Sequence, residues 1–107
     1  MKTLLNDLTF DTNIIGVSNT TLKVNDMVLS VIYGKGTLSS PNTFEISMWM
    51  EDDSNDLIAV SDLVDGEGDG HEVAGWVTEK EINKIIDLMH INPDKIKQLR
   101  ISNINEA

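Results

Sequence analysis

The apolar residues of this chain change their spacing along the sequence, and this change constrains the fold more than any other feature. Residues 43–51 (TFEISMWME) alternate, so that Phe44, Ile46 and Met48 point to one side of an extended chain. A period of two is typical of a half-buried strand. Residues 82–89 instead place isoleucine and methionine at positions i, i+3, i+4 and i+7, the apolar stripe of a helix. The chain therefore combines a sheet with a helix that packs on it.

Further strands are predicted on both sides of this alternating segment. Residues 27–33 (MVLSVIY) are apolar at both parities, which is typical of a central strand covered on both faces. Residues 20–24, 57–64 and 72–77 are shorter candidates, separated by turns rich in glycine, asparagine, aspartate and proline. Together these segments predict an antiparallel meander.

The C-terminal part of the chain has two helix-start signals. Thr78 followed by Glu81 fits a capping box, and Asn92 followed by Pro93 is typical of a second, shorter helix. We therefore predict an α+β fold, an antiparallel β-meander of about four to five strands with two C-terminal helices packed on one face. The length of 107 residues predicts a single compact domain over residues 1–107.

Negative charge is concentrated in the middle of the chain. The sequence has 18 acidic and 8 basic residues, for a formal net charge of −10. Residues 36–79 hold eleven acids and no base, whereas residues 1–35 sum to zero and residues 80–107 sum to +1. The charge is therefore local in sequence, and we expect it to form a surface that attracts a basic partner.

Composition excludes several classes of protein. The chain has no cysteine, so it has no disulfide, thiolate nucleophile or cysteine metal site. No apolar stretch approaches the roughly 18 residues of a membrane span, and the first residues do not resemble a signal peptide. Direct binding of nucleic acid or anionic lipid is not expected, because both need clustered lysine and arginine. We expect a cytoplasmic protein. The excess of isoleucine, asparagine and lysine over alanine and arginine indicates an AT-rich genome, such as that of a bacterium or its phage. If the protein is encoded by a phage, the expected location is the cytoplasm of the host.

Catalytic and metal-binding signals are weak. The segment DGEGDG at 65–70 places three acids at alternate positions, as a calcium loop does, but position twelve is Trp76 and not glutamate. Calcium binding by this loop stays a lesser alternative. His71 and His90 are the only histidines, and no nucleophile motif accompanies them. We expect no enzymatic activity, no metal and no cofactor.

The two tryptophans differ in their expected roles. Trp49 shares its strand face with Glu45 and Glu51, which allows either an exposed interface residue or a member of a second core. Trp76 lies near the end of the predicted sheet, beside the capping box, and we expect it to be buried.

These features predict a small acidic, non-enzymatic inhibitor that binds a basic nucleic-acid-binding protein or nuclease. Carboxylates on one strand face recur at roughly 6.7 Å, which is comparable with the spacing of phosphates along DNA. Such a face could block a basic groove in the manner of anti-restriction or anti-CRISPR proteins. The expected partner contacts are Glu45, Trp49, Glu51, Asp52, Asp53, Asp56, Asp62, Asp65, Glu67, Asp69 and Glu72. The alternative is a virion or assembly component, or an adaptor, that uses an apolar patch around Trp49. The oligomeric state stays open, with a homodimer among the options.

Overall fold

The computed structural model describes residues 5, 8–13, 16–64 and 72–101. Six strands and two helices follow one another along the chain, with a short 3₁₀ helix between the last two strands. They are β1 (Asp11–Thr12), β2 (Val17–Val24), β3 (Met27–Gly34), β4 (Thr43–Met50), β5 (Asp53–Leu57), the 3₁₀ helix η2 (Val60–Leu63), β6 (Val73–Thr78), α1 (Glu79–Ile91) and α2 (Pro93–Lys97).

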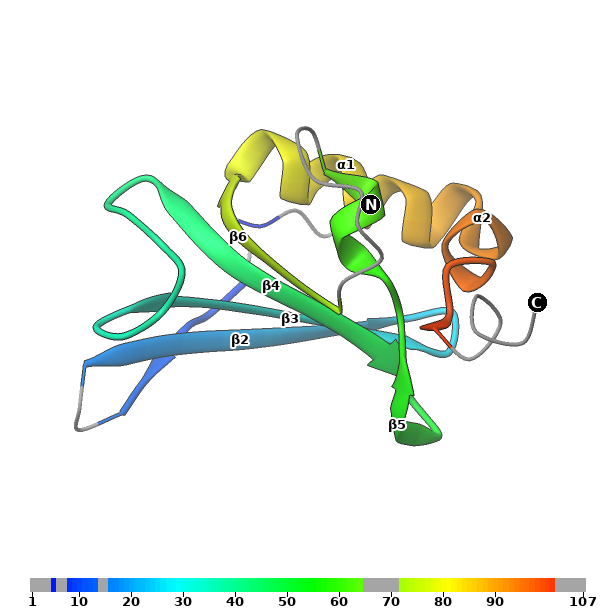
Figure 1. The fold of residues 1–107 in the computed structure, drawn as a ribbon, viewed down its shortest axis with the longest axis horizontal. Coiled ribbons are helices and arrows are strands. Elements are labelled where there is room, and N and C mark those ends of the chain that lie inside the picture. The colour runs from blue at the N-terminus through cyan, green and yellow to red at the C-terminus, as the bar shows by residue number, and fades with distance from the viewer. Residues whose placement is uncertain (1–4, 6–7, 14–15, 65–71, 102–107) are drawn as a thin grey trace.

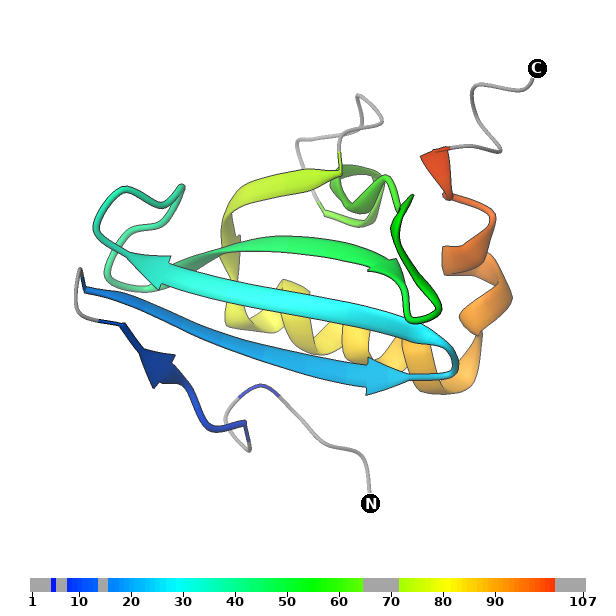
Figure 2. The ribbon, with the colours of Figure 1, turned by 90° about the horizontal axis from the view of Figure 1, so that it is seen from below.

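The strands form one antiparallel sheet in the order β1-β2-β3-β4, and both β5 and β6 pair with the far edge of β4. Strand β6 occupies the first half of that edge, at Thr43–Ser47, and β5 the end, at Trp49 and Met50. The helices lie on one face of this sheet, and in the view from below the strands lie in front of α1 (Figures 1 and 2). The predicted α+β meander with two C-terminal helices is confirmed. No helix in the described part of the chain is long and apolar enough to cross a membrane.

The hydrophobic core lies between the sheet and the helices. Because residues paired across antiparallel strands share a face, the pairs Leu29–Met48 and Val31–Ile46 point to the same side. Helix α1 covers them with the stripe predicted from its sequence. The most deeply buried core side chains are Met27, Leu29, Val31, Ile46, Met48, Ile58, Val60, Ile82, Ile85, Ile86, Met89 and Ile96.

Local signals set the ends of several elements. Asn25 and Asp26 both have positive φ, 50° and 70°, as a two-residue type I′ hairpin turn between β2 and β3 requires. The capping box is present, because the Thr78 side chain accepts from the Glu81 N–H and the Glu81 side chain accepts from the Thr78 N–H. Helix α2 begins at Pro93 as predicted, although the side chain of its N-cap residue makes no capping hydrogen bond.

Two strand predictions are wrong in part. Residues 57–64 were expected to form one strand, but only Leu57 belongs to β5, and Val60–Leu63 form η2. The intervening backbone pairs instead with the C-terminal segment, where the Ala59 N–H donates to the Leu99 carbonyl at 2.7 Å. A short apolar run does not distinguish a strand from a short helix, because its side chains are buried in either structure. Strand β3 was also expected to be covered on both faces, yet no helix of the described residues lies on its second face (Figure 2).

Candidate protein-binding face

The face of the sheet opposite the helices, here called the open face, has no helix of the described residues over it (Figure 2). Strand register defines it, because residues paired across strands lie on the same side. One row across it runs from Lys23 in β2 through Val28 in β3 and Trp49 in β4 to Leu57 in β5. The open face comprises Asp11, Asn19, Thr21, Lys23, Val28, Ser30, Ile32, Glu45, Ser47, Trp49, Leu57 and Val73.

Trp49 lies in the row of this face nearest the β2–β3 turn and is half-buried. Its neighbour Val28 is only 4% exposed, although no helix of the described residues covers it. Val28 is flanked by Trp49 on one side and Lys23 on the other, and an ion pair joins Lys23 Nζ to Glu51 Oε2 at 3.9 Å across β3. Trp49 is thus neither fully exposed nor part of a second core. It forms the centre of a small apolar row bordered by charge.

Two turns meet at one end of the open face. The Glu51 N–H donates to the Asp26 carbonyl at 2.8 Å, which joins the β4–β5 turn to the β2–β3 turn. A hollow of about 520 Å³ lies there, lined by Asp26, Met50, Glu51 and Asp52. The β4–β5 hairpin projects on the side of the sheet away from the helices (Figure 1). We call Glu51, Asp52 and Asp53 the acidic tip. Among the described residues, the acidic tip is where several of the predicted contact residues lie together.

Cations from outside the acidic segment neutralise part of this charge. Lys23 pairs with Glu51, and Lys97 Nζ lies 3.8 Å from Asp26 Oδ2. Both pairs involve a well-exposed carboxylate and are therefore weak. Of these two acids only Glu51 belongs to residues 36–79, so the count of −11 for that segment overstates the charge in space by the share that Lys23 neutralises.

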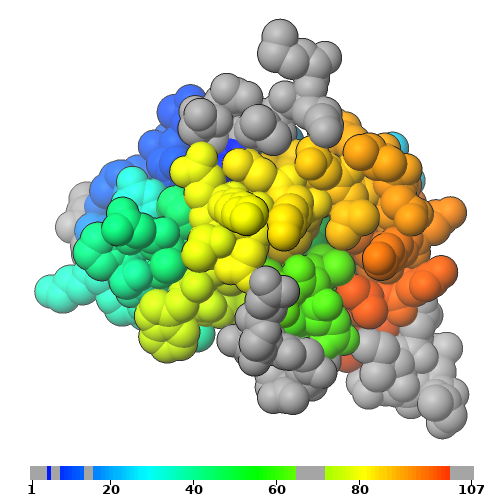
Figure 3. Space-filling model, turned by 90° about the horizontal axis from the view of Figure 1, so that it is seen from above, coloured from blue at the N-terminus to red at the C-terminus, as the bar shows by residue number. Residues whose placement is uncertain are grey.

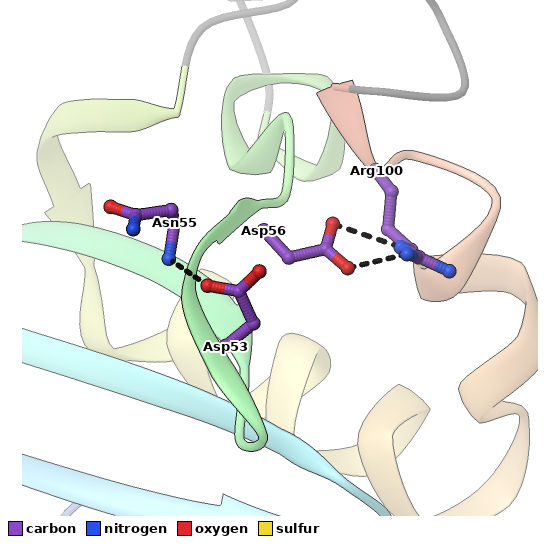
Figure 4. Close-up of polar contacts among 4 residues, drawn as sticks. All are labelled: Asp53, Asn55, Asp56 and Arg100. Atoms are coloured by element: carbon purple, nitrogen blue, oxygen red, sulfur yellow. Dashed lines mark hydrogen bonds and ion pairs between the residues drawn. The ribbon is translucent and has the colours of Figure 1, made fainter.

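Asp56 does not fit its predicted role as a partner contact. Arg100 binds its carboxylate with two hydrogen bonds, from Nε to Oδ1 at 3.0 Å and from Nη2 to Oδ2 (Figure 4). The Asp56 side chain is only 14% exposed. A bidentate arginine–carboxylate pair is among the stronger polar contacts in proteins. Asp56 therefore ties β5 to the C-terminal segment, which is a structural role that the sequence did not indicate.

The remaining predicted contacts are dispersed. Asp52 and Asp53 are exposed on the acidic tip, and Asp53 Oδ1 accepts from the Asn55 N–H at 2.9 Å (Figure 4). Glu45 lies on the open face, where its Oε1 accepts from the Leu38 N–H at 2.9 Å. Asp62 and Glu72 are exposed away from the tip, in η2 and just before β6. Asp65, Glu67 and Asp69, the possible calcium loop and His71 lie outside the described residues.

The prediction that Trp76 is buried is wrong, because this residue is 58% exposed. Strand β6 contains a bulge. Phe44 pairs with Val77 and Ile46 with Ala74, so Gly75 and Trp76 together oppose the single residue Glu45. The extra residue turns the Trp76 side chain out of the alternation that would have buried it. Gly75 was the available signal, since a glycine inside a strand often marks a bulge.

In comparisons with protein-family models, with curated proteins and with solved structures, no match to this chain was found.

Proposed function

We propose that this protein is a non-enzymatic inhibitor that binds the basic nucleic-acid-binding surface of another protein, such as a nuclease. The observation that carries this proposal is the position of the acidic tip at the end of the open face. Asp52 and Asp53 are exposed there, and no cation in the described part of the chain lies within ion-pair distance of either carboxylate. Two uncompensated carboxylates on a projecting hairpin attract a cationic surface.

The composition of the open face supports binding to a protein. Interfaces combine an apolar centre with a polar rim, and tryptophan is common among the residues that dominate binding energy. Here the apolar row that contains Trp49 lies directly beside the acidic tip. The charge would steer association and make it sensitive to salt, while burial of Trp49 would slow dissociation.

The described acids form a local cluster and not a continuous stripe. Glu45 lies at mid-sheet, Glu51–Asp53 at the tip, and Asp62 on η2. We therefore propose that the tip replaces a few phosphates of the nucleic acid at one basic site, and that the rest of the contact is made by the open face.

A second candidate function is an adaptor or assembly component that binds mainly through apolar contacts. The row formed by Val28, Trp49 and Leu57 favours it, because this row gives the open face an apolar contact that does not need the acidic tip. Such binding would depend little on salt.

Capture at two salt concentrations separates these candidates. The tagged full chain is incubated with lysate from a bacterium with an AT-rich genome, at about 50 mM and about 500 mM NaCl. The first proposal expects a nucleic-acid-binding protein that is retained only at the lower concentration and is displaced by added DNA or RNA. Retention at both concentrations, with loss in Trp49→Ala, would favour the adaptor.

A charge-matched pair of variants makes the test specific for the tip. Asp52→Lys with Asp53→Asn changes the charge by +3 and keeps an oxygen that accepts from the Asn55 N–H. Asp94→Lys with Gln98→Lys changes it by the same amount at exposed positions in and after α2, outside the open face. Loss of capture in the first variant alone supports the proposal. Equal loss in both would show that total charge matters and the tip does not.

A further inference from the structure

Trp76 occupies a backbone conformation that disfavours it. Its φ is +51°, in the left-handed region that side chains with a Cβ atom adopt at a cost of roughly 1–2 kcal/mol. Glycine would be the ordinary residue at such a position in a bulge. The adjacent Gly75 meets a different requirement, since a Cβ atom there would lie 2.6 Å from the Leu38 Cβ. The bulge therefore contains one glycine for close packing and a strained tryptophan beside it.

In this strained backbone conformation, the side chain of Trp76 is exposed to solvent. Trp76 is 58% exposed and Leu38 42%, and the two are joined by a hydrogen bond from the Trp76 N–H to the Leu38 carbonyl at 2.8 Å. In Figure 3 the yellow-green surface of β6 projects at the rim of the molecule, next to the green surface of the β3–β4 connection. Strained residues that burial does not explain are concentrated at functional sites.

We propose that Trp76, supported by Leu38, is the anchor that inserts into an apolar pocket of the partner protein. This inference rests on the proposed function for the class of partner, but it assigns the main apolar contact to the β6 bulge and not to the Trp49 row of the open face. Tryptophan is among the residues most enriched at interface hot spots.

Charge identifies the partner as a different protein with cationic groups around that pocket. Glu45 lies opposite the bulge and accepts from the Leu38 N–H. The exposed charged residues flanking the bulge in sequence, Glu72, Glu79 and Lys80, add a further net charge of −1. A second copy of this chain would bring the same acids and a net charge of −10 to the contact, which opposes self-association.

Site-specific photo-crosslinking tests the anchor. The crosslinking amino acid p-benzoyl-L-phenylalanine replaces Trp76, Asp52 or, as an exposed control in α1 on the helix side of the sheet, Lys84, each in the full chain. The three variants are irradiated in the same lysate, and each adduct and its crosslinked peptide are identified by mass spectrometry. The proposal expects one nucleic-acid-binding protein to crosslink at both Trp76 and Asp52, and not at Lys84. The Trp76 adduct should lie on an apolar segment of that protein with lysine or arginine beside it.

The other outcomes separate the two proposals. A crosslink at Asp52 without one at Trp76 overturns the anchor and leaves the proposed function intact. A crosslink at Trp76 alone, to a protein retained in high salt, supports the anchor and contradicts the acidic contact. An absence of adducts at both positions contradicts both.

Affinity measurements on the purified partner complete the test. Trp76→Gly should weaken binding by at least about 30-fold, Trp76→Phe by much less, and the control Lys84→Ala in α1 hardly at all. Circular dichroism of each variant shows whether the fold is kept, and Leu38→Ser provides a second way to reduce the apolar contact. Binding of Trp76→Gly within about threefold of the original would overturn the anchor.

Discussion

Replacing Trp76 by glycine should leave a more stable protein than replacing it by alanine, which reverses the usual order in a strand. In a regular strand, glycine is less stable than alanine by roughly 0.5–1 kcal/mol, because the unfolded chain has more freedom to lose. At Trp76 the backbone φ is +51°, and a Cβ atom carries a penalty that glycine does not. The comparison of the two variants isolates this penalty, since both remove the whole indole.

The magnitude follows from the two opposing effects. The left-handed conformation costs alanine roughly 1–2 kcal/mol, and the entropy of glycine offsets roughly 0.5–1 kcal/mol of that. Between the midpoints of these two ranges, Trp76→Gly should be the more stable by about 0.75 kcal/mol, or roughly 3–6 °C in Tm for a domain of this size. Both variants should be less stable than the original protein. The ring is 58% exposed, so about 100 Å² of a side chain of roughly 250 Å² is buried, worth at most about 2.5 kcal/mol.

The assay is urea denaturation at 25 °C, monitored by far-ultraviolet circular dichroism. For each variant it gives the midpoint of unfolding and the slope of the unfolding free energy against urea concentration. Equal slopes would show that the difference in midpoint reports stability. An alanine variant as stable as the glycine variant, or more so, would refute the claim that the bulge is strained. Backbone strain at Trp76 would then give no reason to assign this residue a role in binding.

Three further substitutions test other contacts by the same denaturation assay. Asp56→Ala should destabilise the fold by about 1.5–3 kcal/mol, because it leaves the Arg100 guanidinium without its bidentate acceptor, and a loss under about 0.5 kcal/mol would show that the pair is not structural. Gly75→Ala should cost about 1–3 kcal/mol, since the new methyl group would lie 2.6 Å from the Leu38 Cβ, whereas an unchanged midpoint would mean that the β3–β4 connection yields freely. Thr78→Ala should cost about 1 kcal/mol through loss of the helix cap, and no change would indicate that water replaces it.

Much of the fold could be predicted because the signals involved are short. Alternation over residues 43–51 depends only on neighbours along one strand, and β4 follows it. The capping box needs only Thr78 and Glu81, three residues apart, and it forms as expected. The stripe in residues 82–89 likewise predicts which face of α1 is buried.

The candidate site was less predictable because its properties depend on residues far apart in the sequence. Asp56 was counted as a free acid, yet Arg100, 44 residues later, binds it. Glu51 and Asp26 come from separate hairpins, and a backbone hydrogen bond brings them to one hollow. Counting charge along the chain cannot show which acids keep a cation beside them.

The sequence by itself determined the class of fold, the helix boundary at Thr78 and the excess of negative charge, since each follows from residues within a few positions of one another. Only the tertiary structure decided that one face of the sheet has no helix of the described residues over it, that Asp56 is neutralised and that Trp76 is exposed. The physical reason is the same in each case. The burial of a side chain and the neutralisation of a charge depend on contacts with residues that are far away in the sequence. In β6, one extra residue in the bulge also reverses the direction of the Trp76 side chain.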